Sequence, residues 1–306
     1  MRILLWHVHG AWTTAFVQGG HDYVVPVLPG RGPDGRGLAR TYDWPDSVSE
    51  LAPGALCDEH FDVVVLQRPH ELDRLLPQWL GHRDVPKVYV EHNAPQGRIA
   101  EMRHPAADRR DLLLVHVTHF NALFWDAGAT PTRVIEHGIV DPGHRYTGDL
   151  PRAAVVINEA RRRARVTGTD LLDRFARTAP LDLFGIDAES LGGEDLPQCD
   201  LHGAMARRRV YLHPIRWTSL GLSLLEAMHL GMPIVALGTT EAHEAVPPGA
   251  GVVSTRLDVL AAEMRRLIDE PEEARERGTV ARAAALERYG LERFLADWDD
   301  VLEEVA

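Results

Sequence analysis

A single carboxylate interrupts a segment that is otherwise almost entirely apolar. Residues 216–237 have the sequence RWTSLGLSLLEAMHLGMPIVAL, in which leucine and methionine at helical spacing predict a buried helix that ends at Gly231. Glu226 lies inside this helix, where burying a charge is costly unless it is paired or hydrogen-bonded. The carboxylate therefore either bonds an arginine or backbone amides, or accepts two vicinal hydroxyls such as those of a ribose. The loop before the helix would direct free N–H groups toward a phosphate.

The cations available to bind such a phosphate are nearly all arginines. Of the 33 basic residues only Lys87 is a lysine. Arg161, Arg163 and Arg165 lie in EARRRARVTG (159–168), before a predicted helix start, so charge-assisted hydrogen bonds to a diphosphate are one interpretation. A solvated basic face is the other, and the sequence does not choose among the three arginines.

Two loops of the first half also carry polar residues at predicted strand ends. The first, HVHGAWTTAF (7–16), contains Gly10, which would let the backbone approach a ligand, and a helix starting near Thr13 would present its positive end. Trp12 in this loop is either a platform for a sugar ring or a core residue. His92 ends a predicted strand and is followed by Asn93, which places it on a loop at the same edge of the sheet.

Short apolar runs alternate with helical patterns along the chain, which is typical of parallel α/β sheets. A break rich in Gly and Pro at 141–151 separates two such series, and 31–58 is expected to hold loops. We expect two doubly wound, Rossmann-like domains over 1–148 and 149–285, facing across a cleft at their strand carboxyl ends. The expected strands are 2–8, 23–28, 62–67, 87–92, 112–118, 132–137, 153–158, 181–185, 209–214, 232–237 and 251–254.

Composition argues against several classes of function. The net charge of −12 disfavours a general nucleic-acid binder or a polybasic membrane-surface protein. No apolar run approaches the roughly 18 residues of a membrane helix. Cys57 and Cys199 form no CxxC pattern, which favours a reducing cytoplasm without disulfides. The 16 histidines form no HExxH motif, so no metal is expected.

The segment that contains Glu226 resembles the nucleotide-binding segment of glycosyltransferase family 4, whose members are retaining enzymes of the GT-B fold. VEHNAP (90–95) is similar to the His-Asp segment of the family, and RVIEHGIVD (133–141) to its hinge turn. Residues 271–298 resemble the C-terminal helices, which implies that a helix over 286–306 returns to the first domain. The residues in register with the main motif are Pro214, Gly221, Leu222, Leu225, Glu226, Ala227, Met228, Gly231, Pro233, Val235 and Ala236.

The resemblance implies a hexosyltransferase that moves a sugar from a nucleoside-diphosphate sugar to an acceptor hydroxyl with retention of configuration. Glu226 would bind the ribose, and Gly221 and Leu222 the donor nucleotide. His92 would contact the donor sugar near the reacting carbon. Thr218 stands where the family has a glutamate against the donor sugar, and it keeps a hydroxyl. The family's lysine on the diphosphate aligns near Thr167, which leaves Arg161, Arg163 or Arg165 as replacements; the loop with Gly10 and Trp12 would face the phosphates and the acceptor.

The expected donor is a UDP- or GDP-sugar, and the acceptor is a small molecule or a glycan. No cofactor or metal is expected, because a phosphate oxygen of the leaving group can accept the proton of the acceptor hydroxyl. Two alternatives remain. One is a relative that binds a nucleotide sugar but has lost turnover, which Thr218 and the missing lysine motivate. The other is an inverting transferase or an epimerase with His9, Asp22 or Glu91 as the base.

Overall fold

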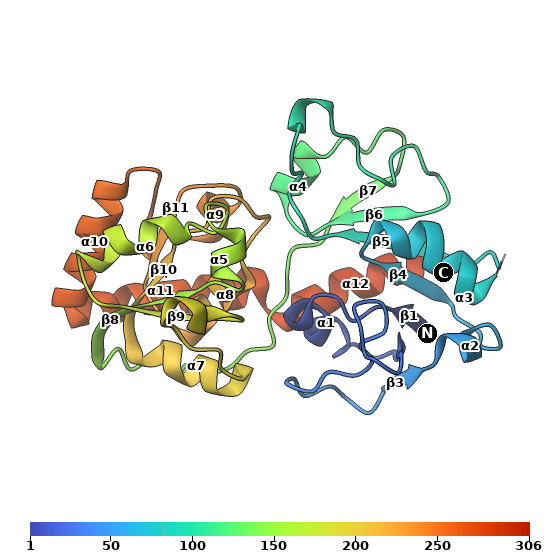
Figure 1. Ribbon diagram of the computed structural model, residues 1–306, viewed down its shortest axis with the longest axis horizontal. Helices are drawn as coiled ribbons and strands as arrows, with labels where there is room; N and C mark the ends of the chain where they lie inside the picture. Colours follow the sequence, from blue (N-terminus) through green and yellow to red (C-terminus); the bar gives the residue numbers. More distant parts are fainter. Residues whose placement is uncertain (82) are drawn as a thin grey trace. The chain divides into compact units, whose positions relative to one another are not determined.

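The computed structural model describes residues 1–81 and 83–306. The chain divides into two compact units, each with its own parallel sheet (Figure 1). Unit 1 comprises Met1–Val140 together with Leu291–Ala306, and unit 2 comprises Asp141–Gly290. The chain thus passes from one unit to the other at 140–141 and again at 290–291, whereas the sequence placed these boundaries at 148 and 285.

The sheet of unit 1 has the strand order β3-β2-β1-β4-β5-β6-β7, and its paired strands are parallel. Strand β4 shows why these segments form such a sheet: Val63, Val64 and Val65 are fully buried, as expected for a strand covered on both faces. The strands are β1 (Arg2–Leu5), β2 (Asp22–Pro26), β3 (Val48–Leu51), β4 (Val63–Leu66), β5 (Lys87–Glu91), β6 (Leu113–His116) and β7 (Thr132–Val134).

Helices cover this sheet on two sides. Leucines of α2 (Pro53–Leu56), of the π-helical turn η1 (Glu71–Leu75) and of α3 (Leu76–Leu80) pack into one buried cluster with Leu4 and Val64. Helix α1 (Gly10–Phe16) lies beside α12 (Leu291–Val305), and the ring of Trp298 meets that of Phe16 at 5.0 Å (Figure 1). The remaining elements are η2 (Ile99–Glu101) and α4 (His119–Phe124). The last helix of the chain therefore belongs to the core of the first unit.

The sheet of unit 2 has the order β12-β11-β10-β8-β9 and is also parallel. Its strands are β8 (Leu150–Val156), β9 (Leu181–Phe184), β10 (Arg208–His213), β11 (Ile234–Leu237) and β12 (Gly251–Ser254). Its helices are α5 (Ala160–Arg163), η3 (Thr169–Leu171), α6 (Leu172–Ala176), η4 (Ala188–Leu191), α7 (Gln198–Arg207), α8 (Leu222–Leu230), α9 (Ala242–Ala245), α10 (Leu257–Asp269) and α11 (Pro271–Tyr289).

The region 31–58, expected to hold loops, has no helix or named strand over 31–47, but it also contains strand β3 and helix α2. Strand β3 (VSEL) lies at the edge of the sheet and pairs only with β2 among the described strands. Its Glu50 accepts hydrogen bonds from Arg31 and from the Leu38 amide, so the strand lacks the apolar run that marks the central ones. Helix α1 begins at Gly10 rather than near Thr13.

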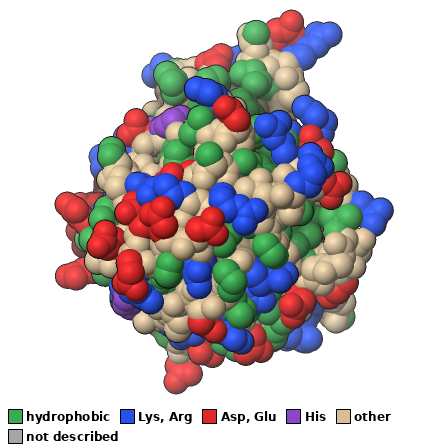
Figure 2. All heavy atoms as spheres, turned by 90° about the vertical axis from the view of Figure 1, so that its left-hand side faces the viewer, with side chains coloured by type: hydrophobic (Ala, Val, Ile, Leu, Met, Phe, Trp, Pro, Cys, Tyr) green, Lys and Arg blue, Asp and Glu red, His purple; other side chains and the backbone are tan. Residues whose placement is uncertain are grey.

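The side of the molecule that carries α10 has charges of both signs. Among the described residues, no helix is long and apolar enough to cross a membrane. Figure 2 shows the side of the molecule that carries α10, where acidic and basic side chains are interspersed and hydrophobic ones are scattered. Arg266 pairs with Glu263, and Arg277 with Glu273, which is why neither sign of charge dominates there.

Candidate functional site

Helix α8 presents the carboxylate that the sequence singled out. It follows β10 through the loop 214–221, begins at Leu222 and ends at Gly231, whose φ of 88° is left-handed, as predicted for a glycine cap. Glu226 is only 6% exposed on this helix. Gly221 precedes it without a side-chain cap, and a Cβ at this position would come within 2.6 Å of the His213 ring. A glycine is therefore required where the chain enters the helix.

The partners of Glu226 are on α7 and are neither an arginine nor backbone amides. The Nε2 of Gln198 donates to Oε1 of Glu226 at 2.8 Å, and the Nε2 of His202 lies 3.8 Å from Oε2. Gln198 and His202 are also 2.9 Å apart through their Nε2 atoms. A small polar cluster thus accompanies the carboxylate, and no sequence pattern pointed to it.

Two loops at the carboxyl ends of neighbouring strands β8 and β10 are joined to each other. The amide of Arg216 donates to the carbonyl of Val166 at 2.9 Å, and its guanidinium binds both oxygens of Asp170 at 2.5 and 2.9 Å. Gly168 has a φ of 74°, and a Cβ there would lie 2.0 Å from the carbonyl oxygen of Pro214. The loop that carries the arginines and the loop that precedes α8 therefore form one edge of the site.

The structure distinguishes the three arginines that the sequence left equivalent. Arg161 donates to the carbonyl of Ser190 at 2.6 Å, and Arg165 pairs with Asp170 at 3.0 Å. Arg163 is half-buried, and its side chain makes no hydrogen bond or ion pair with the described residues. Burial, and then the charge of Arg162, lower the pKa of its guanidinium, although the carboxylate of Glu159 opposes this.

The backbone around Arg163 is strained. Glu159 and Ala164 have φ values of 53° and 43°, in the left-handed region that residues other than glycine rarely adopt. Such strain is found at sites where the surrounding structure fixes an unfavourable conformation. Arg161 and Arg163 lie within the short helix α5 rather than before a helix, as the sequence suggested.

The two threonines at positions where the resemblance expects charged residues have different surroundings. Thr167, near the place of the lysine, is fully buried, and its Oγ1 lies 3.2 Å from the carbonyl oxygen of Ala164. Thr218 lies half-buried on the loop between β10 and α8, three residues before Gly221. Thr167 therefore completes the arginine loop, while Thr218 stands beside the entrance of α8.

In unit 1, His92 comes directly after β5 and is 7% exposed. Its ring meets those of His9 at 4.1 Å, Trp12 at 5.0 Å and His137 at 6.5 Å between centroids. Burial lowers the pKa of His92 well below its ordinary value, and it lowers those of His9 and His137 to about 4 and about 3. The three imidazoles are therefore neutral at physiological pH, which suits hydrogen bonding to uncharged hydroxyls.

Gly10 and Trp12 are placed differently from the predicted ligand-facing loop. Trp12 is 0% exposed and packs in the core against Phe16 at 5.0 Å and Trp298 at 5.8 Å, so no face of its indole is open to a sugar. Gly10 is the first residue of α1, and a Cβ there would lie 2.8 Å from the ring of Tyr42. Of the two interpretations of Trp12, the structure therefore favours a core residue. The group that closely approaches Gly10 is the ring of Tyr42.

A buried pair lies next to His92. The carboxylate of Glu91 accepts a hydrogen bond from the amide of Asn93 at 2.6 Å and another from Nε2 of His104 at 2.9 Å. The Nδ1 of His104 accepts from the amide of Ala106 at 3.0 Å, so its ring proton is on Nε2. Glu91 is thus fully engaged, and Asp22, the other carboxylate considered as a base, lies exposed at the amino end of β2. Neither suits an acceptor base at the carboxyl edge.

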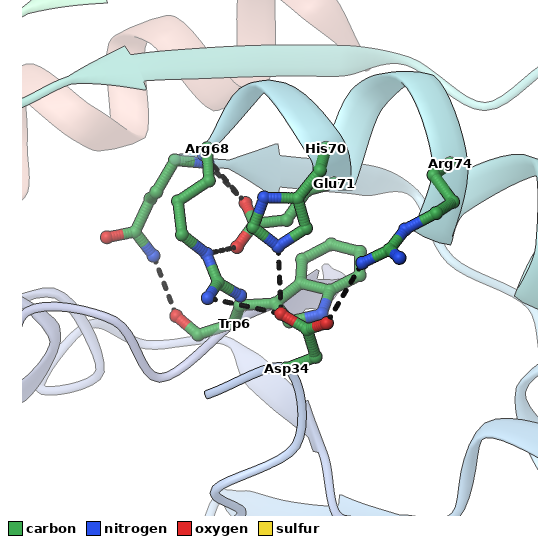
Figure 3. A network of polar contacts seen from close by, with 7 residues as sticks. Trp6, Asp34, Arg68, His70, Glu71 and Arg74 are labelled. Atoms are coloured by element: carbon green, nitrogen blue, oxygen red, sulfur yellow. Dashed lines mark hydrogen bonds and ion pairs between the residues drawn. The ribbon is translucent and has the colours of Figure 1, made fainter. Parts of the chain in front are cut away.

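A second polar network lies at the carboxyl end of β4 (Figure 3). Glu71 is fully buried and accepts from the amides of Gln67 and Arg68 and from Nε of Arg68, at 2.6, 3.0 and 2.6 Å. Asp34 accepts from His70 at 2.8 Å and pairs with Arg68 at 3.3 Å. Burial raises the pKa of Glu71, although Arg68 opposes this. The network fastens the loop after β2 to the end of β4 on the edge that carries His9.

Among the described residues, no group of three or more histidine, cysteine, aspartate or glutamate side chains is arranged to hold a metal ion.

The comparisons with known proteins agree with this picture. Residues 190–270, which include α7, β10 and α8, match the family described as Glycosyl transferases group 1. No curated protein matches the chain in sequence. Sucrose-phosphate synthase from Thermosynechococcus elongatus has a similar structure, with a TM-score of 0.74 and 13% identity over 99% of this chain and 98% of that one. The structure of HepE from Anabaena in complex with UDP has a TM-score of 0.75 and 15% identity over 99% of this chain and 100% of that one.

The two doubly wound parallel sheets and these likenesses define a GT-B fold, so the predicted fold class is confirmed. The predicted resemblance is confirmed over residues 190–270, which match the family described as Glycosyl transferases group 1. At 13–15% identity the solved structures show the fold, and the site is argued from this chain's own residues.

Proposed function

We propose that this glycosyltransferase moves a hexose from a UDP-sugar to an acceptor hydroxyl with retention of configuration. The observation that carries the proposal is Arg163, a half-buried guanidinium that makes no ion pair or hydrogen bond among the described residues, on a strained loop at the strand edge from which α8 starts. The structure of HepE with UDP-glucose, which has a TM-score of 0.72 with this chain, supports the choice of donor.

Each part of the donor would have its own partner in unit 2. The carboxylate of Glu226 would accept the ribose hydroxyls, since it is an acceptor with two oxygens. Arg163 would bind the diphosphate through charge-assisted hydrogen bonds. The free amides of the first turn of α8, after Gly221, would assist, because a helix N-terminus favours an anion.

The reaction would need no base from the protein. The bond between the anomeric carbon and the diphosphate oxygen breaks, the acceptor oxygen bonds that carbon on the same face, and its proton passes to the departing phosphate. Arg163 would stabilise the charge that develops on the leaving group. Neutral His92 would hydrogen-bond a sugar hydroxyl without adding charge near an oxocarbenium-like carbon. In unit 2, Thr218 would offer a hydroxyl as a hydrogen-bond partner.

The acceptor would be a small molecule or a glycan intermediate. The net charge of −12 and the mixed charges on the face drawn in Figure 2 support an acceptor other than a nucleic acid. The cytoplasm remains the proposed compartment, since Cys57 and Cys199 are both exposed free thiols.

Calorimetric titration tests the proposal. The wild type and Arg163→Gln would be titrated with UDP, GDP, ADP, TDP and uridine, and Arg162→Gln is the matched control because Arg162 is exposed on the same turn and pairs with Glu159. We expect micromolar affinity for UDP, a loss of tenfold or more in Arg163→Gln, and no change in the control. Equal losses of UDP and uridine affinity would show that Arg163 is structural.

Thr218 favours a second candidate, a relative that binds a nucleotide sugar but does not transfer it, because its hydroxyl lacks the charge and reach of a carboxylate. Such a protein would bind UDP-sugar and show neither transfer nor slow hydrolysis. If transfer occurs, the anomeric configuration of the product by NMR distinguishes retention from inversion.

A further inference from the structure

The carboxylate of Glu226 is held before any ligand is present. Glu226 reaches out of α8 and meets Gln198, the first residue of α7, which lies 28 residues earlier in the chain. An ionised carboxylate only accepts hydrogen bonds, so the amide nitrogen of Gln198 must face it. The orientation of this amide is therefore fixed by chemistry as well as by geometry.

His202 holds Gln198 in place from one turn further along α7. The same amide nitrogen lies 2.9 Å from Nε2 of His202, which can accept its second hydrogen only when that ring nitrogen carries no proton. His202 is 8% exposed, and its Nε2 is 3.8 Å from Oε2 of Glu226. Both hydrogens of the amide are thus used, one on the carboxylate and one on the imidazole.

This arrangement leaves the lone pairs that two hydroxyls would need. A carboxylate offers about four acceptor positions, and Gln198 occupies one of those on Oε1. Nothing in the contacts of the described residues occupies Oε2 at hydrogen-bond distance. A flexible glutamate would lose side-chain entropy on binding a ligand, whereas one fixed by Gln198 has lost it already.

We propose that Gln198, supported by His202, is a positioning residue that makes Glu226 selective for a nucleotide with an intact ribose. The inference rests on the proposed function, in which Glu226 accepts the ribose hydroxyls. Gln198 fixes the direction of both carboxylate oxygens, so a sugar that lacks one hydroxyl leaves a nearly buried acceptor unsatisfied. A site built to bond a hydroxyl rejects the analogue without it far more strongly than an apolar pocket does.

A purely structural role for Gln198 predicts something different. If the contact served only to join α7 to α8, its loss would lower stability and weaken all nucleotides alike. A positioning role instead changes the ratio of affinities between UDP and deoxy-UDP, because the fixed carboxylate is what detects the missing hydroxyl.

The test is calorimetric titration of the whole chain with UDP, 2′-deoxy-UDP and 3′-deoxy-UDP. The variants are Gln198→Ala, His202→Phe and, as a control, Asp200→Ala. The exposed carboxylate of Asp200 lies on α7 and, among the described residues, accepts a hydrogen bond only from the thiol of Cys199. We expect the wild type to prefer UDP by at least tenfold over one deoxy analogue. The preference should fall at least fivefold in Gln198→Ala, about twofold to threefold in His202→Phe, and not at all in Asp200→Ala.

An unchanged preference in Gln198→Ala, with UDP still bound, would overturn the positioning role and leave the proposed function intact. A wild type that binds UDP and both deoxy analogues equally would also overturn it, since Glu226 would then not read the ribose. A wild type that binds none of the nucleotides would overturn the proposed function together with this inference. Thermal unfolding of each variant separates a loss of fold from a loss of selectivity.

Discussion

Replacing Glu91 by glutamine should destabilise unit 1 because of how His104 is fixed. In the native chain the Nε2 proton of His104 goes to the Glu91 carboxylate at 2.9 Å, while Nδ1 accepts from the Ala106 amide. Glutamine at position 91 can still accept from the Asn93 amide with its carbonyl oxygen. Its NH2 group, however, would then face the N–H of His104, and the imidazole cannot change tautomer without losing the Ala106 bond.

The expected magnitude follows from one buried donor left without an acceptor. Such a group costs about 1–3 kcal/mol, and both side chains here are nearly buried, so little water compensates. For a unit of roughly 150 residues, 1 kcal/mol shifts the unfolding temperature by about 2–4 °C. A central value of about 2 kcal/mol therefore predicts that Glu91→Gln unfolds about 4–8 °C below the wild type.

Thermal unfolding followed by circular dichroism measures this shift. Glu101→Gln is the matched control: it makes the same chemical change on an exposed carboxylate that pairs with exposed Arg98, and it should unfold with the wild type. Because Glu91 and Asn93 flank His92, we also expect a lower kcat with an unchanged donor KM. If Glu91→Gln unfolds within about a degree of the wild type, the assigned tautomer of His104 and its stabilising hydrogen bond to Glu91 are refuted.

Three further predictions concern the donor and pH. Glu226→Ala should abolish measurable UDP binding in a titration while the circular dichroism spectrum stays that of the wild type; unchanged affinity would exclude the ribose role. Thr218→Glu should raise the rate of transfer or hydrolysis of UDP-glucose without tightening UDP, and a slower rate would remove Thr218 from the site. Burial lowers the pKa of His116 and His213 to about 4 and that of His137 to about 3. Between these values and the unfolded pKa of about 6.5, the unfolded chain binds more protons than the folded one, so the free energy of unfolding falls as the pH drops below about 6.5. At pH 5 the loss is on the order of 2 kcal/mol per histidine. Urea unfolding at pH 7 and pH 5 measures it, and equal midpoints would contradict the neutral, buried state of these rings.

Buried strands were predictable because their signal is local. VVVL of β4 and IVAL of β11 are covered on both faces, and a run of branched apolar residues marks such strands without knowledge of the partner strand. Strand β3 lacks that signal, since Glu50 stabilises it through Arg31, nineteen residues away in the chain. The edge of the sheet is therefore the part that sequence patterns describe least well.

The candidate site divides in the same way. Glu226 and Gly231 were found because the apolar spacing around them predicts a buried helix that contains the glutamate and ends at the glycine. Arg163 is singled out because Arg165 pairs with Asp170 and Arg161 donates to Ser190, and these contacts exist only in the folded chain. Gln198 lies in QCDLHGAMAR, an unremarkable helix whose importance comes only from facing Glu226 across two helices.

The electrostatics of unit 2 explain why a single arginine can matter in a protein with a net charge of −12. Such a net charge repels a nucleoside diphosphate at long range, so affinity must come from contacts within the site rather than from steering. Along the loop after β8, Glu159 neutralises Arg162, and Asp170 is shared by Arg165 and Arg216. The acids therefore hold the loop together, while the guanidinium of Arg163 has no ion pair among the described residues and is available to bind a diphosphate.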